Sequence, residues 1–278
     1  MDEAAIRAAF EAACFEELEA LKPGNVHIYG GVHGMDVADF RLAARAAAPE
    51  IAHRGAGVGA RVLAAVEASW LAVPKNTNLG ILLLCAPLAL AAERGGDLRT
   101  SLAGVLAGLD RSDAELAFRA IARASPGGLG TAPAHDVRDP PDATLLQAMQ
   151  AAQGRDRIAW QYANGFADVF DVILLAPEGR ARMWPAVSAY LAFLSSHPDS
   201  HLQRKFGEAV ARQVQDEARP LRKRLALAVE RSDFSRLLDR LSAFDKRLKA
   251  AGLNPGTSAD LTVAALFANK LAAQRQPA

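Results

Sequence analysis

The stretch Val58-Gly-Ala-Arg-Val62-Leu-Ala-Ala-Val66-Glu-Ala-Ser-Trp70 carries a large apolar residue at every fourth position. Side chains four residues apart lie on the same face of an α-helix, so this spacing predicts a helix with one apolar stripe. The same spacing recurs at 237–248, where charged residues fill the other faces. Such amphipathic helices bury their apolar stripe against one another, so the pattern favours a helical fold.

Similar patterns run along the whole chain, and we predict an all-α fold, a single compact multi-helix domain over residues 1–278. Val172–Leu175 is the only strand-like run, and because it has no partner we expect it to end a helix. Ser112-Asp-Ala-Glu115 predicts a capping box, and Gly252 predicts a helix C-terminus. The expected helices cover 3–21, 36–52, 57–73, 77–93, 97–109, 113–124, 143–153, 155–172, 181–195, 199–217, 220–230, 234–250 and 258–273.

The composition restricts the kinds of partner that the protein can have. The 278 residues are 51% hydrophobic, enough for a sizeable core, and 32 basic residues nearly balance 31 acidic ones. This balance argues against a nucleic-acid partner, which requires a basic excess. The longest apolar run, Ile81–Ala92, is shorter than the roughly 20 residues that span a membrane. The acidic start lacks a signal core, and Cys14 and Cys85 form no Cys-x-x-Cys pair. We therefore expect a cytoplasmic protein with free thiols and no membrane partner.

Two long loops interrupt the helical pattern with polar residues. Lys22-Pro-Gly24-Asn-Val-His27 follows Glu17, and Gly30-Gly-Val-His33-Gly-Met-Asp36 comes next. Lysine before Pro-Gly is also an ordinary helix stop, and Asp36 could simply cap the next helix. The stretch Ser125–Asp142 is similarly rich in Gly, Pro and His, and long loops of this kind are often functional.

Two predicted helices begin with polar, glycine-containing segments, Asn76-Thr77-Asn-Leu-Gly80 and Asn254-Pro-Gly256-Thr-Ser258-Ala-Asp260. Free N–H groups and the helix dipole make such termini good anion sites, although caps and an Asn-Pro-Gly turn would produce the same residues. Neither a P-loop nor a dinucleotide-binding glycine motif is present. The pattern therefore indicates a polyphosphate-bearing substrate with a metal ion.

These segments, in this order, resemble the triphosphoribosyl-dephospho-CoA synthase family from about Glu17 to Leu266. The resemblance implies a transferase that uses ATP as a ribosyl donor. A hydroxyl of dephospho-CoA attacks the ribose carbon that carries adenine, adenine leaves, and the triphosphate stays on the transferred ribose.

The resemblance also suggests roles for individual residues. Asp36 or Glu67 would act as base or stabilise the ribosyl cation, and His33 would protonate adenine or bind phosphate. Glu17 and Asp260 are the candidate ligands for Mg²⁺. The expected partners are a nucleotide and a small-molecule acceptor, and a homodimer is left open. The remaining residues expected to hold the nucleotide are Lys22, Gly24, Asn76, Thr77, Gly80, Gly256 and Ser258.

The chain departs from the family pattern in places. Asn78-Leu79 stands where a His-Lys pair is expected, and Thr257 replaces a glycine. The Gly127–Arg138 segment resembles a branch from methanogens and methylotrophs, which carry methanopterin cofactors. Two acceptors therefore stay open: dephospho-CoA, with Arg138 or Lys205 replacing the missing charge, or a less charged methanopterin precursor.

Two other classes of function compete with this prediction. A helical metal-dependent phosphohydrolase would use His135-Asp136 with His27, His33 or His53 and Asp168, but that pair lies in a Pro-rich loop rather than on a helix. A non-enzymatic scaffold would dock partners through Arg219–Arg224. Such charge runs usually form a solvated helix face.

Overall fold

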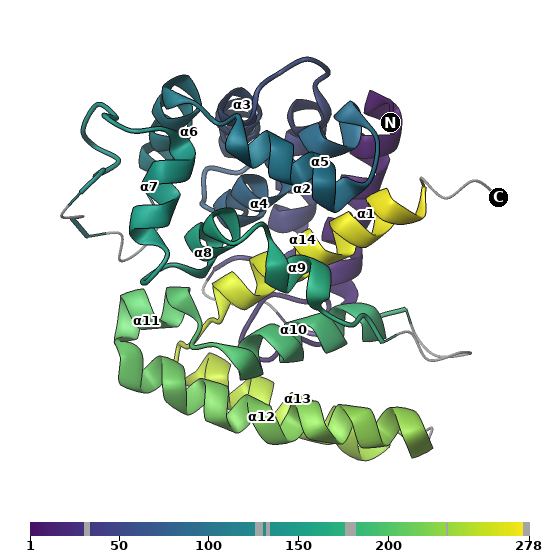
Figure 1. Cartoon of the computed structure of the whole chain (residues 1–278). Coiled ribbons are helices and arrows are strands. Elements are labelled where there is room, and N and C mark those ends of the chain that lie inside the picture. Colours follow the sequence, from purple (N-terminus) through teal and green to yellow (C-terminus); the bar gives the residue numbers. More distant parts are fainter. Residues whose placement is uncertain (31–33, 126–129, 132–133, 176–181, 232, 275–278) are drawn as a thin grey trace.

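The fold is all-α, as predicted. The computed structural model describes residues 1–30, 34–125, 130–131, 134–175, 182–231 and 233–274 (Figure 1). In it, 72% of the chain is helical and no strand occurs among the described residues. The helices are α1 (Glu3–Glu19), α2 (Val37–Ala52), α3 (Val58–Ala72), α4 (Leu79–Arg94), α5 (Leu98–Ala107), α6 (Arg111–Ala124), α7 (Leu145–Ala152), α8 (Arg157–Ala163), α9 (Ala167–Asp171), α10 (Trp184–Ser196), α11 (Ser200–Phe206), α12 (Glu208–Arg231), α13 (Ser235–Ala250) and α14 (Gly256–Ala273).

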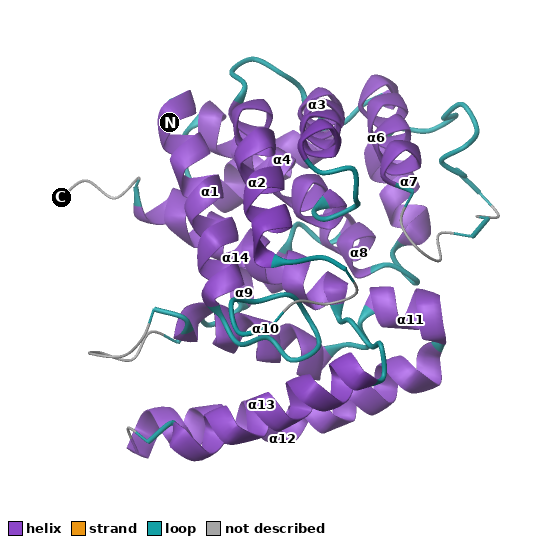
Figure 2. Cartoon of the chain, turned by 180° about the vertical axis from the view of Figure 1, so that it is seen from behind, coloured by secondary structure: helices purple, strands orange, loops and turns teal. Residues whose placement is uncertain are grey.

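Two helices, α4 and α14, form the centre of the molecule. Both are apolar on nearly every face, and a helix of this kind must be surrounded by others. α14 packs against α1, α4 and α10, so the first and last helices of the chain lie side by side (Figures 1 and 2). One hydrophobic cluster runs from Ile6 in α1 to Leu271 in α14.

The long helices α12 and α13 lie along one edge of the molecule (Figure 2). They are amphipathic, and α12 packs against α10 and α11. The turn between α13 and α14 brings Asn254 to the loop after α1. Helices α10 to α13 therefore lie on one side of the central helices α4 and α14 (Figure 1).

Several predicted helix boundaries were wrong. The helix expected over 155–172 breaks after Ala163, because Gly165 and Phe166 have φ of 62° and 59°. The break expected near Pro220 occurs instead at Gly207, where φ is 90°, and α12 continues through Pro220. Ala218 and Leu221, on either side of Pro220, are buried, and this packing stabilises the continuous helix.

Two local predictions also need correction. The capping box at the start of α6 pairs Asp110 with Asp113, two residues before the predicted Ser112-Glu115 pair. Val172–Leu175 does not end a helix, since α9 stops at Asp171 and Val172 is extended. Gly252, in contrast, follows α13 with φ of 69°, as expected for a residue that ends a helix.

Within the described part of the chain, no single helix is long and apolar enough to cross a membrane, while α4 and α5 together would pass only as a pair bent by 113°.

Candidate active site

A cavity of about 500 Å³ opens where the starts of α4, α8, α11 and α14 converge. This volume is in the range of small-molecule sites. Six of the residues predicted from sequence line it: Glu17, Asn76, Thr77, Gly80, Gly256 and Asp260. Its apolar part is lined by Met35, Phe40, Leu79, Ile81, Leu83, Phe118, Ile121, Val137, Leu145, Ala148, Met149, Ile158 and Ala159.

The start of α4 offers hydrogen-bond donors to this cavity. The N-cap residue Asn78 makes no capping hydrogen bond, and only the N–H of Leu79 is bonded to a side chain, Oδ1 of Asn76 at 3.4 Å. The next N–H groups of the first turn therefore stay available. The Thr77 side chain is buried, with 7% of its residue surface exposed, and its Oγ1 has no hydrogen-bond partner among the described residues. A buried hydroxyl without a partner costs free energy, so its position at an uncapped helix start indicates a ligand contact.

Gly80 allows α14 to approach this helix start. A Cβ atom at Gly80 would lie 2.1 Å from Oδ2 of Asp260 and 2.8 Å from Cδ1 of Ile158. Only glycine leaves room for the carboxylate there. The predicted role of Gly80 in nucleotide binding therefore depends on the space that it gives Asp260.

Two carboxyl groups, from α1 and α14, give the cavity its electrostatic character. Burial raises the pKa of Asp260 well above its ordinary value, and repulsion from Asp199, Glu17 and Asp156 raises it further. Burial also raises the pKa of Glu17, against the opposing attraction of Lys22. Concentrated negative charge of this kind favours a bound cation.

Lys22 lies behind the cavity wall rather than in it. Its ammonium group is fully buried and donates to a Glu17 carboxylate oxygen, to Oδ1 of Asn25 at 3.1 Å and to the carbonyl of Val26 at 2.6 Å. These three acceptors match the three protons of an ammonium group. Lys22 therefore holds Glu17 in place. The sequence had suggested that Lys22 binds the nucleotide, but its ammonium group is not free to do so.

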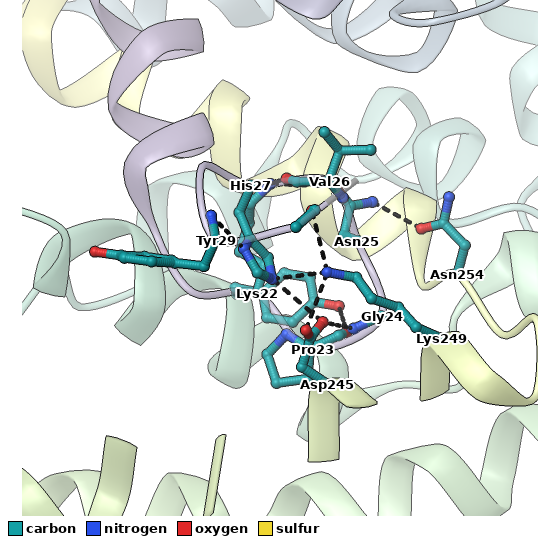
Figure 3. Close-up of polar contacts among 12 residues, drawn as sticks. Lys22, Pro23, Gly24, Asn25, Val26, His27, Tyr29, Asp245, Lys249 and Asn254 are labelled. Atoms are coloured by element: carbon teal, nitrogen blue, oxygen red, sulfur yellow. Dashed lines mark hydrogen bonds and ion pairs between the residues drawn. The ribbon is translucent and has the colours of Figure 1, made fainter. Parts of the chain in front are cut away.

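Gly24 likewise shapes the loop without lining the cavity. Its φ is 83°, and a Cβ there would lie 2.7 Å from the carbonyl of Leu253. Its N–H donates to Oδ1 of Asp245 at 2.9 Å, and the neighbouring Asn25 donates to Asn254 at 2.7 Å (Figure 3). Packing against the turn after α13 thus accounts for this glycine.

The start of α14 is already occupied by a carboxylate from this chain. Oδ2 of Asp199 accepts from both N and Oγ of Ser258 at 2.8 Å, and Oδ1 accepts from the backbone of His201 and Leu202 at 3.0 and 3.1 Å. Asp199 thereby caps α11 and α14 together. Because both donors of Ser258 are used, the expected phosphate contact at this residue is not available.

Two of the three residues predicted as catalytic, Asp36 and Glu67, lie elsewhere. Asp36 forms a capping box with Asp39 at the start of α2, which was the structural alternative. Glu67 lies exposed on α3. Neither residue lines the cavity. His33 lies outside the described residues.

The cavity contains basic residues that the sequence did not single out. Arg155 is exposed at its lining and has no ion pair with a described residue, whereas Arg204 donates to Oδ2 of Asp156 at 3.1 Å. The His201 ring fills the space beside Gly256, whose Cβ would lie 2.5 Å from Nδ1. Burial lowers the pKa of His201 despite the attraction of Asp199. Arg155 lies in the turn before α8, and His201 and Arg204 lie within α11. No sequence motif marks these residues, so only the tertiary fold identifies them.

The departure at Asn78-Leu79 changes the cavity wall. Nδ2 of Asn78 donates to Oγ of Ser69 at 3.0 Å, which fastens the loop to α3, and Leu79 presents an apolar side chain. Arg138 pairs with Asp136, a lining residue, while Lys205 lies over the ring of Phe206 and not at the cavity. Neither Arg138 nor Lys205 therefore lines the cavity at the position of the missing charge.

The competing phosphohydrolase hypothesis finds little support in these contacts. His135 pairs with Asp142 through Nδ1 at 2.7 Å, and Asp136 pairs with Arg138. Across the described ranges, no group of three or more His, Cys, Asp or Glu residues could hold a metal ion by itself. A metal in this cavity would need ligand oxygens from its substrate.

Comparisons with known proteins identify the family of this chain. Residues 3–277 match the model of the CitG family, described as ATP:dephospho-CoA triphosphoribosyl transferase. No curated protein matches in sequence. The fold is similar to the crystal structure of a candidate triphosphoribosyl-dephospho-CoA synthase from Archaeoglobus fulgidus, with a TM-score of 0.63, 22% identity and coverage of 84% of this chain and 97% of the other. Because the family model matches nearly the whole chain, this protein belongs to the ATP:dephospho-CoA triphosphoribosyl transferase family.

Proposed function

We propose that the cavity transfers the triphosphoribosyl group of ATP to a hydroxyl acceptor, dephospho-CoA, and releases adenine. The observation that carries this proposal is the buried Thr77 hydroxyl, which has no partner among the described residues and lies at the start of α4. Together with Arg155 and Arg204, these donors suit a chain of phosphates. The apolar part of the cavity suits the purine base.

The reaction exchanges one bond at the anomeric carbon of ribose for another. The acceptor oxygen forms a bond to this carbon as the bond to adenine N9 breaks, and adenine leaves with the bonding pair. The proton lost by the hydroxyl balances the proton that adenine gains. Positive charge develops on the ribose, and carboxylates stabilise such charge in glycosidic chemistry. Asp260 and Glu17 are the carboxylates at hand.

The same two residues suit Mg²⁺. This ion binds through one or two carboxylates together with substrate phosphates, and repulsion from Glu17 contributes to the raised pKa of Asp260. When bound, Mg²⁺ would neutralise the triphosphate. Glu17, held by Lys22, and Asp260, held against Gly80, supply preorganised oxygens for it.

A second acceptor has specific support. The cavity presents Leu79, and the Asn78 amide bonds to Ser69, so neither side chain supplies positive charge to a phosphorylated acceptor. A methanopterin precursor with a ribitol hydroxyl carries less charge and has a flat ring for the apolar part. Adenine release measured in parallel with dephospho-CoA and with this precursor distinguishes the two, and robust turnover of dephospho-CoA would exclude the switched acceptor.

Products distinguish this reaction from phosphoryl transfer. ATP, Mg²⁺ and acceptor should produce free adenine without ADP or phosphate. Formation of ADP instead would identify a kinase or ATPase and end the proposal.

Thr77→Val tests the phosphate site itself. A hydrogen bond to a charged group contributes about 1.5–3 kcal/mol, so ATP affinity should fall by roughly 10- to 100-fold. The melting temperature should not fall, because the hydroxyl has no partner in the described protein. Thr100→Val, at an exposed position of α5 outside the cavity, is the control for ATP affinity. Equal ATP affinity in both variants would contradict the site.

A further inference from the structure

We infer that Asp245 of α13 is a positioning residue for the cavity, acting through the amide of Gly24 on the Lys22–Asn25 turn and so on Glu17. The inference rests on the proposed function for its kinetic readout. No residue of α13 lines the cavity, so any effect of Asp245 on the reaction must pass through other residues.

The first step is the contact between α13 and the loop. Asp245 is buried, and its Oδ1 accepts from N of Gly24 at 2.9 Å and lies 3.2 Å from Nε2 of His27. Its Oδ2 accepts from Nζ of Lys249 at 3.0 Å (Figure 3). A buried carboxylate with this many donors holds them in fixed positions.

Lys249 closes the cluster on its far side. Its ammonium group contacts Nε2 of His27 at 3.0 Å and donates to the carbonyl of Gly30 at 3.1 Å. The loop is thus held at two points by residues one helical turn apart on α13. Tyr190 of α10 adds a third, because its hydroxyl donates to the carbonyl of Pro23 at 2.6 Å.

The second step runs from the turn to the cavity. N of Asn25 donates to the carbonyl of Lys22 at 3.0 Å, closing the turn around Gly24. The Lys22 ammonium then bonds both to Glu17 and to the Asn25 side chain, and these two residues line the cavity. A displacement of Gly24 would therefore move Lys22 and Asn25 of the same turn, and through their hydrogen bonds it would move Glu17.

The test compares Asp245→Ala with Asp245→Asn in steady-state adenine release. Asparagine keeps an oxygen for the Gly24 amide, so its KM for Mg-ATP should stay within about threefold of wild type. Alanine leaves the amide unheld, and KM should rise roughly tenfold or more while kcat changes less, because Glu17 binds the metal-nucleotide. Asp239→Asn, exposed on the same helix, should change neither constant.

Melting temperatures separate positioning from a purely structural role. A lowered melting temperature with unchanged KM in Asp245→Ala would overturn the inference, as would equal KM values for the alanine and asparagine variants. If the alanine variant does not fold, Asp245→Glu replaces it, because the longer acid displaces the turn at constant charge and should raise KM. If wild type releases no adenine, the proposed function fails, and calorimetric Mg-ATP affinity of the same variants still decides the role of Asp245.

Discussion

Gly80 and Asp260 approach each other closely where α4 and α14 begin at the cavity. The carboxylate occupies the volume that any larger residue at position 80 would fill. Its ionisation is opposed by burial and by neighbouring acids. Sites often keep such unfavourable groups because function requires them, at a cost in stability.

Gly80→Ala should reduce adenine release by about 100-fold, because a displacement near 1 Å of a reacting group has effects of this size. The added methyl group would force Asp260 and Ile158 to move. Gly104→Ala is the control, since nothing lies within 4 Å of a Cβ there and the residue is helical. That variant should keep full activity and gain about 0.5–1 kcal/mol of unfolding free energy. Equal activities in the two variants would refute the close fit.

Asp260→Asn should raise the melting temperature while abolishing adenine release. A carboxyl whose pKa is raised in the folded state favours folding below its unfolded pKa, and that contribution is lost as pH rises through the folded value. The variant's advantage should therefore be small near pH 4 and larger near pH 8, at about 2–4 °C for each kcal/mol. Thermal melts across pH measure it, and a pH-independent difference would contradict the assigned burial.

At the scale of residues, the sequence predicted which residues line the cavity better than it predicted their hydrogen-bond partners. Thr77, Gly80 and Asp260 line the cavity as expected from polar helix starts. Lys22 and Ser258 are instead satisfied by Glu17 and Asp199. Local sequence cannot reveal such pairing, because Asp199 and Ser258 are 59 residues apart and meet only through packing.

At the scale of helices, Asp199 joins the start of α11 to the start of α14, and both helix starts line the cavity. Only 3% of its surface is exposed, and it receives four hydrogen bonds from the two helix starts. The orientation of Asp260 on α14 therefore depends on a residue outside that helix.

Asp199→Ala should lower the free energy of unfolding by about 1–4 kcal/mol, since a lost cap costs about 0.5–2 kcal/mol and two caps are lost. Denaturant titration measures this value. Asp110→Ala removes the single cap of α6 and should cost about half as much. A smaller loss for Asp199→Ala than for Asp110→Ala would show that the double cap contributes little.

Helix existence was predictable from apolar spacing, whereas several breaks were not. The break predicted near Pro220 does not occur. Burial of apolar residues along α12 stabilises the helix by more than the free energy lost with the one hydrogen bond that proline removes. Gly207 supplies the actual turn with its positive φ. Phe166 adopts a left-handed conformation that its residue type does not favour, and this is why one predicted helix became α8 and α9.

At the scale of the whole molecule, the cavity is lined by acidic residues from α1, the N-cap of α8 and α14, and by two arginines. ATP alone adds negative charge to this set. Mg-ATP at 100 times its Kd should raise unfolding free energy by about 2.7 kcal/mol, or roughly 5 °C or more in melting temperature. The same ATP concentration with EDTA should produce less than half this shift. An equal shift without the ion would argue against Glu17 and Asp260 as its ligands.

The pairing of α1 with α14 affects how the protein acquires activity during synthesis. Asp260 is made more than 240 residues after Glu17. Domains form from the N-terminus onward as the chain is made, at about 5–20 residues per second. A nascent chain therefore carries an incomplete form of the proposed nucleotide pocket until α14 has emerged, so chains that lack α14 should leave cellular ATP untouched.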